Sequence, residues 1–296
     1  MEIEFTLYKG KIKGKFLGPT EDKPNRHMYY VEGKRKTGCT TFLGIKDKSA
    51  PLMSYVRDQT VKHLLTMVNG ESDSRKYTLK EIVEALYESD ANTTRAADLG
   101  SEIHDWCEKY IDFKLKNGPM PEMPEDQNVL TGVTSFLEWE SSHKVKFIWT
   151  EKVLYSKKYD YIGKGDIAAK VDGLTCLVDI KTGNGIYNSV RAQTAAYAFA
   201  DTEECGLKYD GRWALRLAKE TEEEYLERMA LKNKIRKILG KSDQIVEPYQ
   251  VFEAMYLDNE KGSMKEDFVA FINHLELYRW DQKTDFWKIK TNTVGV

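Results

Sequence analysis

Asp166, Asp179 and Lys181 are the residues whose types and spacing could support chemistry. They lie in the stretch IGKGDIAAKVDGLTCLVDIKTG, residues 162–183, which reads as two short strands around an Asp172-Gly173 hairpin turn of favoured composition. In that register Asp166 lies opposite Asp179, with the two Cβ atoms roughly 4.5–5.5 Å apart. Lys181 follows Asp179 by two residues, so its side chain points to the same side of the sheet.

Two like charges opposed across a sheet destabilise it, and the apolar residues on both strands make burial of the acids costlier still. Either one carboxyl is protonated, or a cation lies between the two acids. Oxygen ligands on adjacent strands suit a hard divalent ion such as Mg²⁺ or Mn²⁺, and Lys181 would then neutralise developing negative charge or position a water. The alternative is a surface hairpin with two solvated aspartates, and a register slip of one residue would place the acids on opposite faces.

The elements that must position these residues follow from hydrophobic periodicity and turn signals. Upstream, the sequence predicts a hairpin around Glu32-Gly33, helices at 50–68 and from Thr78, and a helix at 94–116 that ends before a Pro-rich connection. From residue 126 the order is αβββαβαβα, with strands expected at 146–155, 161–171, 174–181, 212–219 and 248–257. Alternating strands and helices of this kind predict an α/β domain around a mixed, mainly antiparallel sheet.

The helix expected at 187–201 carries a polar pair, Gln193 and Tyr197, at i, i+4 spacing. That spacing places both side chains on one helix face, and the neighbouring alanines would let this helix approach the sheet closely. The pair would then lie near the carboxylate end of the hairpin. The alternative is a packing helix with a polar pair at its edge.

Three short motifs occur in order at close spacing: G-x-G-D at 163–166, D-I-K-T-G at 179–183 and Q-T-A-A-Y at 193–197. Together they resemble the RecB-like exonuclease branch of the PD-(D/E)XK nuclease superfamily, which includes phage exonucleases, the mitochondrial genome-maintenance exonuclease and CRISPR adaptation nucleases. The resemblance is strongest over 98–200. It implies a restriction-endonuclease-like core, with a central mixed β-sheet flanked by helices and a helical N-terminal region.

The same resemblance assigns roles to individual residues. A Gly-x-x-[Ile/Val]-His element of the family matches Gly100, Ile103 and His104, so His104 is expected to bind metal. An acid on the preceding strand matches Glu151, which would contact the metal indirectly. The implied metal ligands are His104, Asp166, Asp179 and the carbonyl of Ile180. The implied catalytic residues are Asp166, Asp179, Lys181, Gln193 and Tyr197.

The activity that the resemblance implies is Mg²⁺- or Mn²⁺-dependent hydrolysis of DNA, by an exonuclease acting on ends or single strands in replication, recombination or repair. The chain has no phosphate-binding Gly-x-x-x-x-Gly-Lys-[Ser/Thr] motif, so a helicase or recombination partner would be a separate chain. Some relatives hold an iron–sulfur cluster through a late cysteine group, but no cysteine follows Cys205, so no cluster is expected. The alternatives are a non-catalytic nucleic-acid-binding or assembly module on the same fold and a phosphohydrolase acting on nucleotides.

The chain is expected to divide into an N-terminal part, 1–93, and a nuclease core, 94–296, with a helical insertion near 220–247. Residues 1–48 hold eleven Lys and Arg against six Asp and Glu, although the net charge of the whole chain is only −2. A basic arm of this kind could track DNA phosphates, and residues 37–58 resemble a DNA-contacting arch in phage relatives. A solvated basic face is the alternative.

Composition also bears on the cellular compartment. No stretch approaches the roughly 18 uninterrupted apolar residues of a membrane span, and the N-terminus has no apolar signal region. The four scattered cysteines indicate reduced thiols rather than a disulfide framework. We therefore expect a protein without membrane contact in the cytoplasm of a bacterial or phage-infected cell.

Overall fold

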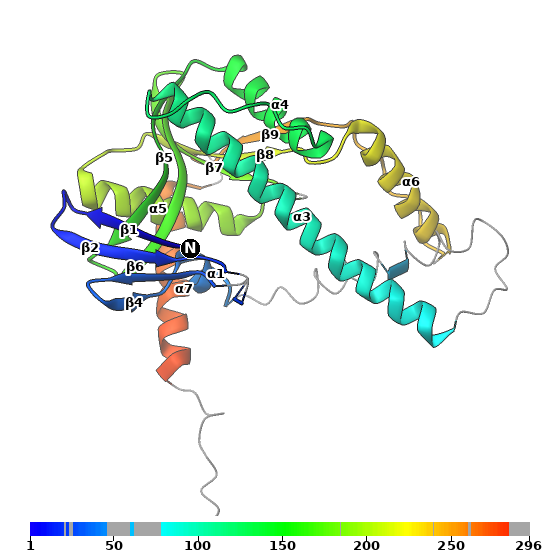
Figure 1. Cartoon of the computed structure of the whole chain (residues 1–296), viewed down its shortest axis with the longest axis horizontal. Helices are drawn as coiled ribbons and strands as arrows, with labels where there is room; N and C mark the ends of the chain where they lie inside the picture. The colour runs from blue at the N-terminus through cyan, green and yellow to red at the C-terminus, as the bar shows by residue number, and fades with distance from the viewer. Residues whose placement is uncertain are drawn as a thin grey trace, which may run out of the picture.

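A five-stranded mixed sheet forms the centre of the computed structural model, in the order β5-β6-β7-β8-β9 (Figure 1). Its strands are β5 Val145–Ser156, β6 Tyr161–Val171, β7 Leu174–Lys181, β8 Gly211–Leu217 and β9 Phe252–Tyr256. Neighbouring strands are antiparallel except β7 and β8, which are parallel. The predicted α/β class and mainly antiparallel mixed sheet are confirmed. The structure describes residues 1–20, 22–23, 26–45, 60–61, 78–183, 185–238, 240–259 and 262–283.

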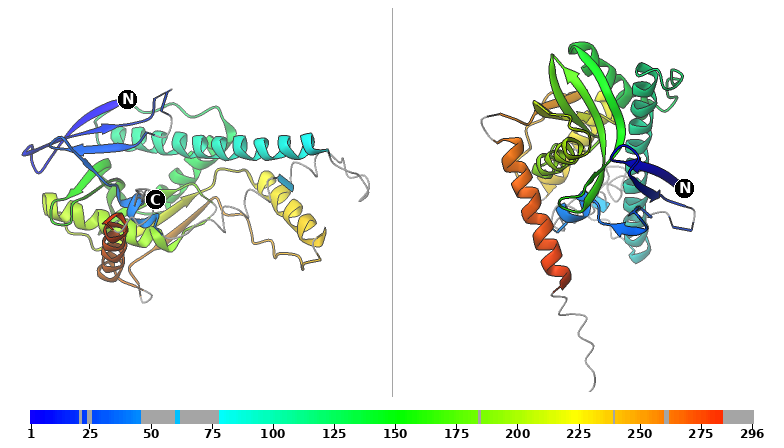
Figure 2. Two further views of the ribbon diagram at one scale, coloured as in Figure 1. Left: turned by 90° about the horizontal axis from the view of Figure 1, so that it is seen from below. Right: turned by 90° about the vertical axis from the view of Figure 1, so that its left-hand side faces the viewer.

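Helices cover both faces of this sheet (Figure 2). On one face lie α3, Leu79–Lys114, and α4, Gln127–Ser142, which bury a core that includes Ile103 and Phe136. On the other face lies α5, Asn188–Cys205, with α7, Met264–Lys283, and the short α1, Cys39–Leu43, packed against it. The charged helix α6, Glu222–Ile238, lies within the predicted insertion.

The hairpin of β6 and β7 forms as predicted. Asp172 and Gly173 both have positive φ, at 51° and 91°, as a two-residue hairpin turn of type I′ requires. The opposed pairs run from Val171–Leu174 to Ile167–Val178, which confirms the predicted register over this part of the hairpin.

The N-terminal region differs from the prediction. Residues 2–36 form a second, four-stranded antiparallel sheet: β1 Glu2–Leu7, β2 Ile12–Leu17, β3 Met28–Val31 and β4 Lys34–Lys36. The predicted Glu32-Gly33 hairpin is confirmed, whereas strands β1 and β2 were not predicted for the basic N-terminal arm. Apolar side chains of β1, β2 and β3 pack against Tyr155 and Ile162, as a half-buried sheet requires.

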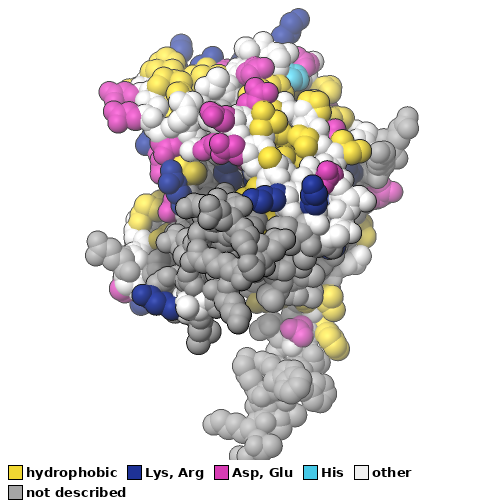
Figure 3. Space-filling view, turned by 90° about the vertical axis from the view of Figure 1, so that its right-hand side faces the viewer, with side chains coloured by type: hydrophobic (Ala, Val, Ile, Leu, Met, Phe, Trp, Pro, Cys, Tyr) yellow, Lys and Arg dark blue, Asp and Glu magenta, His cyan; other side chains and the backbone are white. Residues whose placement is uncertain are grey.

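The expected break between residues 93 and 94 falls inside α3, which the structure shows as one helix where the sequence predicted two. The helix expected at 50–68 lies outside the described residues except for 60–61, which are helical. On the described part of the face in Figure 3, acidic, basic and apolar side chains are interspersed. None of the described helices combines the length and apolar character that a membrane crossing requires.

Candidate metal centre

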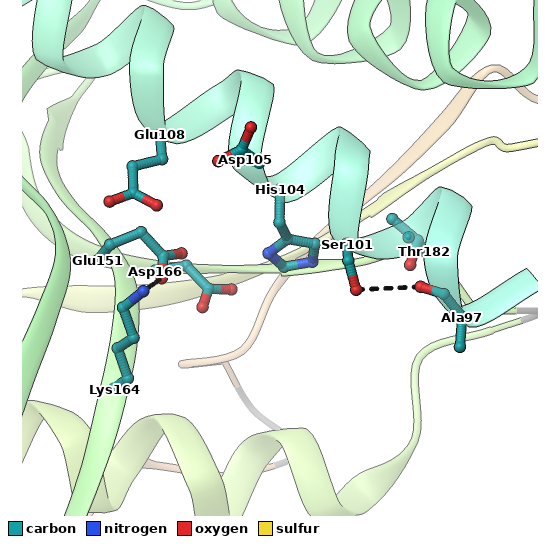
Figure 4. Close-up of a pocket in the computed structure, with 10 residues that line it drawn as sticks. Ala97, Ser101, His104, Asp105, Glu108, Glu151, Lys164, Asp166 and Thr182 are labelled. Atoms are coloured by element: carbon teal, nitrogen blue, oxygen red, sulfur yellow. Dashed lines mark hydrogen bonds and ion pairs between the residues drawn. The ribbon is translucent and has the colours of Figure 1, made fainter. Parts of the chain in front are cut away.

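A pocket of about 430 Å³ lies between α3 and the strands β5 and β6 (Figure 4). His104, Asp105 and Glu108 come to it from α3, while Glu151 comes from β5. Its remaining charged side chains, from β6, are Lys164 and Asp166. The pocket therefore gathers charged residues from a helix and from two consecutive strands of the sheet.

Gly100 explains how α3 comes so close to the sheet. A Cβ atom at this position would lie 2.5 Å from Oγ1 of Thr182, which follows the last residue of β7. The absence of a side chain lets the helix pack directly against the end of that strand. His104, one turn further along α3, then faces the pocket from the same side of the helix.

Three side chains in the pocket have the arrangement of a metal site. His104, Glu151 and Asp166 each offer one ligand atom, and these atoms all lie within 4.8 Å of one another. Burial, reinforced by Lys181, lowers the pKa of His104 to about 4, so its imidazole is neutral and has a lone pair for a metal. Glu151, expected to act indirectly, offers its carboxylate as closely as the other two.

Asp166 lies where the hairpin strands stop pairing. The ladder ends at Ile167–Val178, and the N–H of Ile180 donates to Oδ2 of Asp166 at 2.7 Å instead of continuing the ladder. The predicted direct opposition of Asp166 and Asp179 is therefore not part of the ladder. The Asp166 carboxylate accepts the next N–H donor of β7 in place of a backbone carbonyl. Asp166 also lines the pocket beside α3.

Glu151 lies opposite this irregularity on β5. The β5–β6 ladder pairs Thr150 with Ile167 and Lys152 with Gly165, but omits Glu151 and Asp166. Glu151 also has a positive φ of 47°. A left-handed backbone at a non-glycine residue costs of the order of 1–3 kcal/mol and is concentrated at functional sites. The backbone of Glu151 is therefore left out of the ladder, and its carboxylate lines the pocket.

Asp179 lies outside the pocket lining and is fully buried. It forms a close ion pair with Lys181, and no other polar group among the described residues pairs with its oxygens. Burial raises the pKa of Asp179 to about 6; Lys181 opposes that shift and repulsion from Asp166 adds to it. A buried carboxylate with a single polar partner is costly, so this residue fits a further cation nearby.

Lys181 lies on the same side of β7 as Asp179, as predicted. Burial disfavours its charge, but Asp179 and Asp166 outweigh that effect and raise the pKa of Lys181. The side chain is therefore a cation in this state. It is suited to stabilising negative charge rather than to accepting a proton.

Gln193 and Tyr197 do share one face of α5, because Nε2 of Gln193 donates to the Tyr197 hydroxyl at 3.1 Å. A Cβ at Gly163 would overlap the buried Tyr197 ring. Successive residues of a strand face opposite sides, so Tyr197 at Gly163 and the pocket at Lys164 lie on opposite faces of β6. The structure thus places this pair against the sheet and outside the pocket lining.

Three charged pocket residues were missed from the sequence: Asp105, Glu108 and Lys164. Glu108 follows His104 by four residues, and helical spacing alone could have placed it on the same face. Lys164 precedes Asp166 by two residues in the G-x-G-D motif, where strand alternation could have placed it beside that acid.

Comparison with known proteins adds no family to this geometry. No protein-family model matches the chain, and no curated protein matches it. The function is therefore argued from the arrangement of the site and from the motif resemblance.

Proposed function

We propose that this chain is a divalent-metal-dependent deoxyribonuclease built on a restriction-endonuclease-like core. The observation that carries the proposal is the convergence of His104, Glu151 and Asp166 within 4.8 Å, beside a buried Asp179–Lys181 pair. Neutral imidazole and carboxylate ligands fit Mg²⁺ or Mn²⁺, and the Ile180 carbonyl would complete the set.

The charge of the site supports a divalent ion. Five carboxylates lie in or beside the pocket, and among the described residues two lysines of the same group offset part of their charge. A divalent cation would offset most of the remaining negative charge. The carboxylates are Asp105, Glu108, Glu151, Asp166 and Asp179, and the lysines are Lys164 and Lys181.

Each residue has a task that its surroundings support. A bound ion would supply a polarised phosphate and a more acidic water. The Ile180 N–H holds the Asp166 carboxylate in position, and Asp179 keeps Lys181 charged. Lys181 then stabilises negative charge that develops on the phosphate. Gln193 and Tyr197 fix α5 against β6 and so position these strands.

Exonuclease action on DNA ends or single strands rests on the motif resemblance, because relatives with these motifs mostly process ends. The same resemblance supports a role in replication, recombination or repair in a bacterial or phage-infected cell. A helicase or recombination partner would be a separate chain. These features are analogies at the level of family and fold.

The second candidate is a non-catalytic nucleic-acid-binding module. One observation favours it: the ion pairs Lys181–Asp179 and Lys164–Glu151 already offset two of the acids without any metal. In that case the acids would serve only to hold the strands and α3 together.

The test uses DNA labelled at either the 5′ or the 3′ end, single- or double-stranded, with Mg²⁺ or Mn²⁺. The wild type should degrade it, whereas Asp179→Asn and Lys181→Ala should fold and not cut. Glu138→Gln, an exposed carboxylate on α4, is the matched control and should cut normally. Normal cleavage by both site variants would overturn the proposed site. Intact circular DNA would identify an exonuclease, and DNA binding without cleavage of any substrate would favour the second candidate.

A further inference from the structure

Lys164 forms an ion pair with Glu151, one of the three residues that converge on the candidate metal position. Figure 4 shows its side chain rising from β6 to the Glu151 carboxylate. The metal site thus already contains a cation that belongs to the chain itself.

The surroundings of Lys164 keep it charged and close to the acids. Burial disfavours its charge, but Glu151, Glu108 and Asp166 outweigh that effect and raise its pKa. Its side chain is nevertheless 41% exposed, against 14% for Glu151. The side chain of Lys164 is therefore partly open to solvent, whereas that of Glu151 is mostly buried.

We propose that Lys164 is an exchangeable counter-ion: it neutralises Glu151 in the metal-free protein and, once a divalent cation binds that carboxylate, turns to the phosphate of the substrate. This inference rests on the proposed function and deepens it. It assigns to Lys164 the contact with the phosphodiester that approaches the ion.

The two partners differ in their freedom to move. Glu151 is held by a strained backbone at φ 47° and by burial, so its carboxylate stays in place. Lys164 has a flexible four-carbon stem and a half-exposed side chain, so the lysine is the partner that moves. An ammonium binds phosphate as a point charge and needs no fixed orientation to do so.

Lys181 cannot take this role. It pairs with the fully buried Asp179, its side chain is 29% exposed, and it does not line the pocket. A lysine that left Asp179 would abandon a carboxylate that has no other polar partner among the described residues. The structure therefore separates a fixed lysine from an exchangeable one.

The proposal predicts effects of opposite sign on two ligands. Without Lys164, Glu151 is free, so metal should bind more tightly to the DNA-free protein. The contact with the phosphate is lost as well, so DNA should bind more weakly. If the ion pair only holds the fold together, its removal should lower stability and should not strengthen metal binding.

The experiment compares the wild type with Lys164→Gln and Lys164→Arg, and with Lys170→Gln as a matched control on an exposed position of the same strand. Mn²⁺ is titrated calorimetrically without DNA. Lys164→Gln should bind Mn²⁺ about 2- to 5-fold more tightly, the size of a lost competing ion pair. Lys164→Arg and Lys170→Gln should match the wild type.

DNA binding is then measured with a fluorescein-labelled oligothymidylate and Mn²⁺, all in a Lys181→Ala background to prevent cleavage. Lys164→Gln should weaken binding and reduce the salt slope, in log units, by about 0.7, the loss of one phosphate contact on single-stranded DNA. Lys164→Arg should restore both.

Unchanged or weaker Mn²⁺ binding by Lys164→Gln would overturn the inference. An unchanged salt slope would overturn it as well. The proposed function would survive either result if the wild type binds Mn²⁺ and Glu151→Gln does not. A wild type that binds no Mn²⁺ would remove both.

Discussion

Asp166 and Asp179 occupy different environments, although the simplest hairpin register would make them equivalent. Asp166 reaches the pocket and accepts the Ile180 N–H, whereas Asp179 is fully buried against Lys181. The pKa of each is raised by burial, most clearly that of Asp179, at about 6. One acid thus lines the pocket, and the other pairs with the charged lysine beside it.

Glu151 should make stability depend on pH in a recognisable way. Burial, with Asp166 adding and Lys164 opposing, raises its pKa from 4.5 to about 7. The folded protein therefore retains a proton that the unfolded chain loses in this window. The free energy of unfolding of the metal-free protein should fall as pH rises from 4.5 to about 7 on account of this residue. Glu151→Gln lacks that loss and should gain stability relative to the wild type, by on the order of 2–3 kcal/mol.

Urea denaturation in EDTA at pH about 5 and about 8 measures this difference. His104, whose pKa burial lowers to about 4, has the opposite pH dependence. It is present in both proteins, so its contribution cancels when the two are subtracted. Glu138→Gln, exposed on α4, should run parallel to the wild type. A constant difference between Glu151→Gln and the wild type would mean that Glu151 ionises normally.

At the scale of elements, the hairpin could be predicted because its turn residues fix the register. Asp172 and Gly173 tolerate the positive φ that the turn requires, and the ladder follows from them. The direct approach of the Glu151 carboxylate to His104 and Asp166 could not be predicted in the same way. The strands part at Asp166, and no rule of alternation foresees where a side chain replaces a backbone partner.

The N-terminal sheet was missed for a different reason. The apolar alternation is clear in β1, but Lys and Gly interrupt β2 and β4 consists of Lys and Arg alone, so the pattern does not continue from strand to strand. The pattern gains meaning only when the strands pair and present one apolar face to Tyr155 and Ile162. The continuous α3 was missed because the prediction separated a helix beginning at Thr78 from another at 94–116.

The contact between α5 and β6 gives a prediction at this scale. Gly163→Ala should destabilise the protein by about 1–3 kcal/mol, because the added Cβ overlaps the ring of Tyr197 in a packed interior. In a Tyr197→Leu background the same change should cost less, since the ring is gone. The measurement is a double-mutant cycle by urea denaturation.

Gly183→Ala is the control for this cycle, because a Cβ there meets nothing within 4 Å. Its cost should be the same in both backgrounds. Equal costs of Gly163→Ala with and without the ring would show that the glycine serves another purpose than the approach of α5.

At the scale of the whole molecule, the N-terminal sheet lies against the strands that carry the pocket. Its inner face packs on Tyr155 and Ile162, and charges of the site shift the pKa values of two of its residues. Lys164 adds to burial in lowering the pKa of His27, and Glu151 adds to burial in raising that of Tyr29. A strand of DNA leaving the pocket on this side would therefore meet the sheet.

The outer face of that sheet should contribute to DNA binding through charge. Register aligns Lys15 with Tyr30 and Tyr30 with Arg35, and strand alternation places Lys13 on the same face. Replacing Lys13, Lys15 and Arg35 by Gln should reduce the salt slope of single-stranded DNA binding by about 2 log units if all three contact phosphates. The effect should appear in fluorescence anisotropy across a salt series, with the thermal stability unchanged. The matched control removes three exposed lysines near the far end of β5 and β6: Lys144, Lys146 and Lys170. An equal loss in both variants would mean that only net charge matters, since local contacts must depend on where the charges lie.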